Sequence, residues 1–113
     1  MISKASRLNR NEIDSIKQSP LKYRDGGMLV LYQKNQLQHS KIAVVVTKKI
    51  SKSAVQRNYL KRIIIDSISL ELKKHPHLPL NLIFYPSHTF IQLSPSNKIK
   101  TISNIFKHLC KKT

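Results

Sequence analysis

The chain has 113 residues, and its 21 lysines and arginines against 5 acidic residues give a formal net charge of +16. This length suggests one domain spanning residues 1–113, and the 40% hydrophobic content excludes the composition of a disordered chain. So large a positive excess implies an anionic partner, with nucleic acid the first candidate and an anionic membrane surface the second.

The N-terminal half predicts one helix followed by strands. The helix covers residues 9–18, where Ile13 and Ile16 share a face because they are three residues apart. Asn9 and Glu12 resemble a capping box, with Asn in place of the usual Ser or Thr. Strands are expected at residues 21–24, 28–34 and 41–48, with Asp25-Gly26-Gly27 forming a turn between the first two.

The C-terminal half predicts a long helix at residues 51–74, a strand at 80–85 and a last helix at 97–111. The element order is therefore α-β-β-β-α-β-α. This order indicates an α/β (α+β) two-layer sandwich, in which three helices pack on a sheet of about four strands.

The long helix mixes cations with aliphatic residues in the stretch SAVQRNYLKRIIID, residues 53–66. At 100° per residue the mixture separates into two arcs. One arc spans about 140° and is polar, and it contains Arg57, Asn58, Lys61 and Arg62. The opposite arc is aliphatic and contains Leu60, Ile63 and Ile64. A solvated helix face is the alternative interpretation of such a charge cluster.

A second basic cluster, Thr47, Lys48, Lys49 and Lys52, lies where the third strand leads into this helix. The unpaired N–H groups of a helix N-terminus already favour anions. A merely solvated helix would favour acidic residues in its first turn, so lysines at this position indicate a phosphate-binding site.

The block VVVTKKISKSAVQRNYLKR resembles the signature of the bacterial ribonuclease P protein subunit. That signature is an aliphatic strand, a Ser/Thr-Lys-Lys turn, a spacer with Ala-Val, and Arg-Asn-x-x-Lys-Arg in a helix. Arg7-Leu8 before the first helix, the segment LVLY ending at Tyr32, the chain length and the element order fit the same family. The matching residues are Thr47, Lys48, Lys49, Lys52, Ala54, Val55, Arg57, Asn58, Lys61 and Arg62.

The resemblance implies that the catalyst is a partner RNA that holds magnesium ions, and that the protein contributes no catalytic residue. It implies a left-handed strand-helix-strand crossover, against the general right-handed rule. The partners it implies are the catalytic RNA and precursor tRNA, with no membrane and no small-molecule substrate. Residues implied to bind the RNA are Lys48, Lys49, Lys52, Arg57, Asn58, Lys61 and Arg62. A cleft between the first helix and the sheet would hold the single-stranded 5′ leader of precursor tRNA, lined by Ile13, Ile16, Tyr32, Thr47 and Lys48.

The sequence departs from the family pattern at several positions. Ile13 stands nearest to the usual Phe of the first helix, and Ala43 and Ser51 replace glycines. Tyr59 and Ile65 stand where the family carries arginine. Ile65 falls near 80° on the helix wheel, within the polar arc, so one cation of the expected RNA-binding face is missing.

Other chemistry finds little support in the residues. Five histidines, one cysteine and five dispersed acids lack the spacing of a metal site or of a protein-based magnesium nuclease. A single thiol forms no internal disulfide, and without a signal-like segment or an apolar run of ~20 residues a cytoplasmic location is expected. A structural ribosomal-type RNA-binding protein and a DNA-binding module remain as alternatives.

Overall fold

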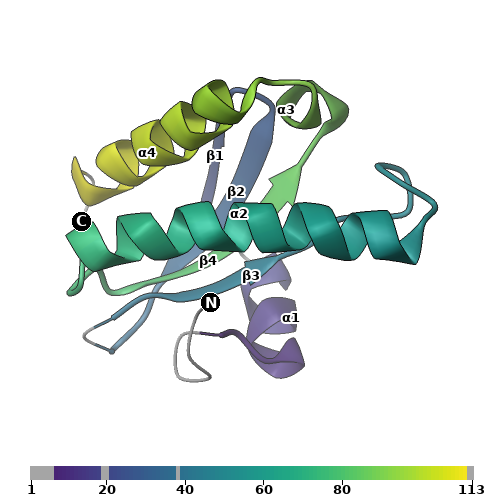
Figure 1. Cartoon of the computed structure of the whole chain (residues 1–113). Coiled ribbons are helices and arrows are strands. Elements are labelled where there is room, and N and C mark those ends of the chain that lie inside the picture. Colours follow the sequence, from purple (N-terminus) through teal and green to yellow (C-terminus); the bar gives the residue numbers. More distant parts are fainter. Residues whose placement is uncertain (1–6, 19–20, 38, 112–113) are drawn as a thin grey trace.

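The computed structural model describes residues 7–18, 21–37 and 39–111. Within them the chain forms one sheet with helices on both faces (Figure 1). The fold class and the element order are as predicted, with one short helix added before the last. The elements are α1 Arg10–Gln18, β1 Leu21–Asp25, β2 Met28–Lys34, β3 Lys41–Val44, α2 Ala54–Lys74, β4 Leu80–Pro86, α3 His88–Ile91 and α4 Pro95–Lys111.

The four strands form a mixed sheet in the order β1-β2-β4-β3. β1 and β2 form an antiparallel hairpin through the predicted turn, where Gly26 and Gly27 have φ values of 55° and 83° that favour glycine. β4 inserts between β2 and β3, antiparallel to β2 and parallel to β3. β3 and β4 therefore form a strand-helix-strand unit through α2, and its left hand stays a prediction.

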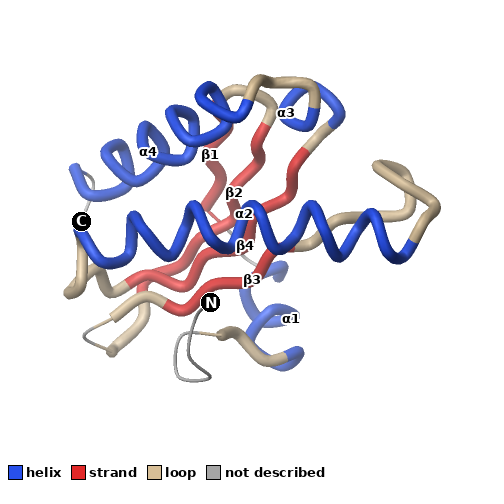
Figure 2. Tube along the Cα trace, in the orientation of Figure 1, coloured by secondary structure: helices blue, strands red, loops and turns tan. Residues whose placement is uncertain are grey.

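Strand alternation divides the core into two layers. The larger layer lies between the sheet and the pair α2 and α4, and the smaller layer lies against α1 on the other face (Figure 2). Phe84 of β4, Ile68 of α2 and Phe106 of α4 are fully buried in the larger layer. Ile16 of α1 is fully buried in the smaller layer beside Ile83.

β3 is shorter than its predicted range of 41–48. Its regular pairing ends at Val44, although the Val45 N–H still donates to the Phe84 carbonyl at 2.9 Å. The chain then turns, and the Ile50 N–H donates to the Thr47 carbonyl at 3.0 Å. This turn follows the strand and carries Lys48 and Lys49, both of which are exposed.

The short helix α3 follows β4 directly. Its Phe90 is fully buried, and the Ser87 hydroxyl donates to the Gly27 carbonyl at 2.6 Å. A side chain at Gly27 would place its Cβ 2.6 Å from the Phe90 nitrogen, so glycine is required for this close approach. Periodicity could not reveal a helix of four residues.

Candidate RNA interface

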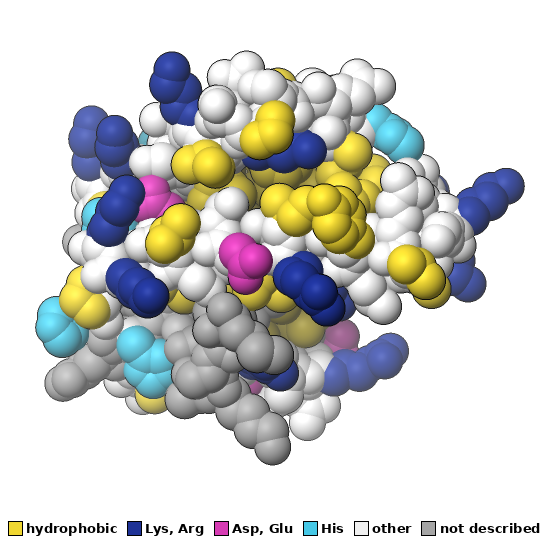
Figure 3. All heavy atoms as spheres, viewed as in Figure 1, with side chains coloured by type: hydrophobic (Ala, Val, Ile, Leu, Met, Phe, Trp, Pro, Cys, Tyr) yellow, Lys and Arg dark blue, Asp and Glu magenta, His cyan; other side chains and the backbone are white. Residues whose placement is uncertain are grey.

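The basic cluster predicted before the long helix forms an exposed loop, residues 47–53, called here the lysine loop. It projects past the end of the sheet at the N-terminus of α2 (Figure 1). Lysine and arginine side chains extend from the same end of the molecule (Figure 3). Lys48, Lys49 and Lys52 are all exposed, so the loop offers three ammonium groups to a partner.

Hydrogen bonds from two helices hold the lysine loop. Ser53 is the N-cap of α2, and its hydroxyl accepts from the Gln56 N–H at 3.3 Å. Arg57 Nη1 donates to the carbonyls of Ser51 at 2.9 Å and Lys52 at 3.0 Å. On the other side, His88 Nε2 of α3 lies 3.0 Å from the Lys49 carbonyl oxygen. The two atoms form a hydrogen bond in the tautomer that carries its hydrogen on Nε2.

The first half of α2 exposes three of its four predicted polar residues, whereas Arg57 is half-buried. Asn58, Lys61 and Arg62 are exposed and are called here the polar face of α2. On the opposite arc Leu60 and Ile64 are buried and Ile63 is half-buried, and Ile64 packs in the larger core, so the helix has two faces here. Tyr59, which replaces a family arginine, is 61% exposed and adds an aromatic ring to this surface.

Ile65 does not lie on the exposed basic face, which corrects the helix-wheel assignment. Its side chain is half-buried and packs against the larger core. The N-terminal half of α2 projects past the sheet, whereas the part around Ile65 and Ile68 lies over it, so the buried arc widens along the helix. A helix wheel assigns the same buried arc to the whole length of a helix, so it cannot represent this widening.

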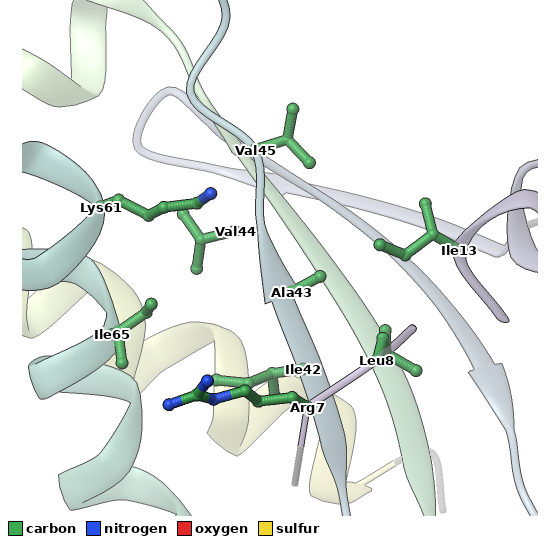
Figure 4. A pocket seen from close by; sticks show the side chains of 9 residues that line it. All are labelled: Arg7, Leu8, Ile13, Ile42, Ala43, Val44, Val45, Lys61 and Ile65. Atoms are coloured by element: carbon green, nitrogen blue, oxygen red, sulfur yellow. The ribbon is translucent and has the colours of Figure 1, made fainter. Parts of the chain in front are cut away.

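A groove lies along the outer edge of β3, with a volume of about 460 Å³. Figure 4 shows Lys61 and Ile65 of α2 on one side of the strand and Ile13 of α1 on the other. Leu8 runs beside the strand, and its N–H donates to the Ile42 carbonyl at 3.0 Å. This β3-edge groove thus has an apolar floor, with cationic side chains only from Lys61 and Arg7.

The N-terminus of α1 is fixed as the sequence predicted. The Asn9 N–H donates to Glu12 Oε1 at 3.0 Å, and the Glu12 N–H donates to Asn9 Oδ1 at 2.8 Å, which completes the capping box. Lys41 Nζ of β3 donates to Glu12 Oε2 at 2.9 Å. The bonds from Asn9 and Lys41 hold the pKa of the Glu12 carboxyl below its ordinary value. The ion pair between Lys41 and Glu12 ties α1 to the sheet.

Two of the predicted cleft residues are placed elsewhere. Tyr32 is only 8% exposed and belongs to the larger core, on the α2 and α4 face of the sheet. Alternation along β2 instead turns Leu29 and Leu31 toward α1. Ile16 is fully buried and supports the α1 layer from inside, whereas Ile13 is half-buried and lines the β3-edge groove.

A half-buried aromatic residue on the α1 face is Tyr85 of β4, which the sequence patterns did not assign to the site. It packs partly against the smaller core and lines a second groove of about 750 Å³, called here the Tyr85 groove. Leu29, Thr47, Lys49 and His88 also line this groove. The alternation of β4 could have identified Tyr85, because it falls opposite Leu29 in the antiparallel pair.

Within the described residues, no group of three or more His, Cys, Asp or Glu side chains is placed to hold a metal ion. Nor is any described helix both long and apolar enough to cross a membrane. The lysine loop and the polar face of α2 expose ammonium groups, a guanidinium group and an amide.

Comparison with known proteins identifies the class to which this fold belongs. A family model described as Ribonuclease P matches residues 2–110, and the chain belongs to that family as a protein subunit of the tRNA-processing endoribonuclease. Solved structures share the fold. The RNase P protein from Thermotoga maritima is 20% identical with a TM-score of 0.74, covering 90% of this chain and 96% of its own. A Staphylococcus aureus RNase P protein mutant with defective mRNA degradation activity is 19% identical with a TM-score of 0.79, covering 93% of this chain and 88% of its own.

Proposed function

We propose that this chain binds the catalytic RNA of ribonuclease P and the 5′ leader of precursor tRNA, and so assists RNA-catalysed removal of the leader. The observation that carries the proposal is the position of the lysine loop between two surfaces. The loop continues into the polar face of α2, and its Thr47 and Lys49 also line the Tyr85 groove. One loop can thus contact a structured RNA and a single strand together.

The polar face of α2 and the lysine loop would bind the phosphates of the catalytic RNA. Lysines act there as mobile point charges, and the guanidinium of Arg62 can bond two phosphate oxygens at once. Asn58 offers an amide between them that can donate and accept hydrogen bonds. Binding would release counterions from the RNA, so affinity should fall steeply with salt.

The Tyr85 groove would hold the leader strand. Single-strand binders combine a cationic groove with aromatic rings on which bases stack. Here Lys49 and Arg24 supply cations beside one carboxylate, Asp25, and Tyr85 supplies the ring, with Leu29 as part of the apolar floor. This assignment replaces Tyr32, whose ring is buried on the other face of the sheet.

Magnesium would be held mainly by the partner RNA, where it would supply the activated water and charge stabilisation of the cleavage. The protein residues would bind and orient the two RNAs, and no step passes through a metal held by the protein. A cytoplasmic location belongs to the same proposal, since precursor tRNA would be met there.

The proposal is tested by reconstitution with the cognate catalytic RNA. Cleavage of precursor tRNA at low magnesium concentration should be stimulated by this protein, and the stimulation should depend on leader length. Purified chain and RNA are compared with RNA alone, using substrates that carry leaders of different lengths. Absence of stimulation together with leader-independent binding would favour the structural ribosomal-type alternative.

Replacing Tyr85 with alanine should weaken binding of leader-bearing tRNA by about 5- to 150-fold, the equivalent of losing one stacked base at ~1–3 kcal/mol. Mature tRNA lacks the leader, so its affinity should not change. Tyr85→Phe keeps the ring and is the matched control. Equal losses for precursor and mature tRNA in a titration of the reconstituted complex would contradict a leader-stacking role.

A further inference from the structure

We propose that Arg57 is a positioning residue, which acts on RNA by holding the lysine loop. Any phosphate contact of its own contributes much less to RNA affinity than the lysine contacts that it positions. The inference rests on the proposed function, because it concerns how the same surface binds RNA. It departs from the sequence-based assignment of Arg57 as one more direct RNA ligand.

The hydrogen bonds of Arg57 point back to the loop. A single guanidinium nitrogen, Nη1, donates to the carbonyls of Ser51 and Lys52 at 2.9 and 3.0 Å. Arg57 is half-buried, whereas its neighbours Asn58 and Gln56 are exposed. Hydrogen bonds from a charged donor are roughly twice as strong as neutral ones, so these two bonds are substantial restraints on a short segment.

The loop needs such restraints because of its charge. Lys48, Lys49 and Lys52 lie within five residues, and their ammonium groups repel one another. Without a tether the loop would sample many conformations, and RNA would have to restrict them at an entropic cost. Arg57 adds a fourth positive charge nearby, yet it is bonded to carbonyl oxygens, which carry partial negative charge. It therefore fixes the direction in which the lysines project.

Lys61 and Arg62 provide the contrast. Both are exposed on α2 about one turn beyond Arg57, so both are accessible for direct contact with a partner. A direct contact and a positioning residue differ in what their removal changes. Removing a residue that contacts RNA directly eliminates one ion pair with the RNA. Removing a positioning residue weakens several of these ion pairs together.

Amide hydrogen exchange of the free protein tests the tether without RNA. In Arg57→Ala, the amides of Ile50 and Ser51, which donate to the Thr47 carbonyl, should exchange several-fold faster, while amides of the β4 core stay unchanged. Arg62→Ala removes the same charge from the same helix and should leave the loop amides unchanged. Unchanged exchange in Arg57→Ala would overturn the inference, whether or not the protein binds RNA.

The salt dependence of RNA binding tests the consequence. Removing one phosphate contact lowers the slope of log affinity against log salt by about 0.7–0.9, which is the result expected for Arg62→Ala. Arg57→Ala should lower this slope by clearly more than the loss of one phosphate contact does. In addition, Lys49→Ala should cost less affinity in the Arg57→Ala background than in the wild type, because its contact is already weakened.

A slope change of one contact for Arg57→Ala, together with full additivity with Lys49→Ala, would identify Arg57 as an ordinary direct ligand and overturn the inference. Thermal unfolding of each variant shows whether the fold is intact, and a general loss of stability would not produce the pairwise coupling. Failure of the wild-type protein to bind RNA would instead contradict the proposed function, while the exchange experiment still decides the role of Arg57 in the loop.

Discussion

Replacing Lys48, Lys49 and Lys52 together with glutamine should lower the salt slope of RNA binding by about 2 to 3, at ~0.7–0.9 for each lost phosphate contact. Affinity at low salt should fall roughly tenfold or more, because electrostatic contacts supply most of such binding. The reason lies in the structure, where all three side chains are exposed on one restrained loop. Filter binding or fluorescence titration of the catalytic RNA at several salt concentrations measures the effect.

The last helix offers a matched control. Lys100, Lys107 and Lys111 are exposed on α4, which packs at the other end of the larger core from the lysine loop (Figure 1). Their replacement with glutamine lowers the net charge by the same three units. If both triple variants reduced the slope equally, RNA would be responding to net charge alone, and the lysine loop would not be a specific site.

The sequence predicted the elements with strong periodicity because each had one solution that buries its apolar residues. The sequence predicts one apolar stripe on α4, formed by Ile99, Ile102, Ile105, Phe106 and Leu109. The structure buries all of these except Ile99, which is 54% exposed. The capping box at Asn9 is also confirmed, and of the two serines that the sequence offers as N-cap of α2, Ser51 and Ser53, the structure uses Ser53. Both signals depend on neighbouring residues only. Such signals can be identified from the sequence because the residues that form them lie close together in the chain.

The failures concern quantities that depend on distant parts of the chain. Tyr32 was placed in the cleft by resemblance, but the face to which β2 turns a residue depends on how the sheet packs between its two helical layers. The end of β3 depends on where its pairing with β4 stops, at Val44 opposite Phe84, although β4 itself continues to Pro86. The burial of Ile65 depends on how far α2 overhangs the sheet, which no helix wheel contains.

Ile65 shows how such a correction changes a functional argument. On the wheel it was a missing arginine in the RNA-binding face. In the structure it packs against the core and lines the β3-edge groove beside Lys61. An arginine there would have its aliphatic stem over the same groove and its guanidinium at the rim. If the family carries arginine here, as the resemblance implies, isoleucine removes a charge from the edge of the proposed interface and leaves the centre of the polar face unaltered.

The C-terminal half of α2 provides the second large prediction, which concerns stability. Ile68→Ala should lower the free energy of unfolding by about 2–5 kcal/mol, because it removes a fully buried side chain and leaves a cavity. That loss is a large part of the ~5–15 kcal/mol by which domains of this size are stable. Urea denaturation followed by circular dichroism measures it.

Leu70→Ala is the matched control, since leucine has the same number of carbons and lies two residues away on the same helix. Its side chain is 57% exposed, so Leu70→Ala should lower the free energy of unfolding clearly less than Ile68→Ala does. The remaining loss comes from the part of the Leu70 side chain that is buried. At temperatures where Ile68→Ala is still folded, its salt slope for RNA should equal that of the wild type, because the lysine loop and polar face lie at the other end of α2. Similar stability losses in the two variants would contradict the placement of α2 on the sheet, and a changed slope would mean that core packing and RNA contacts are coupled along the helix.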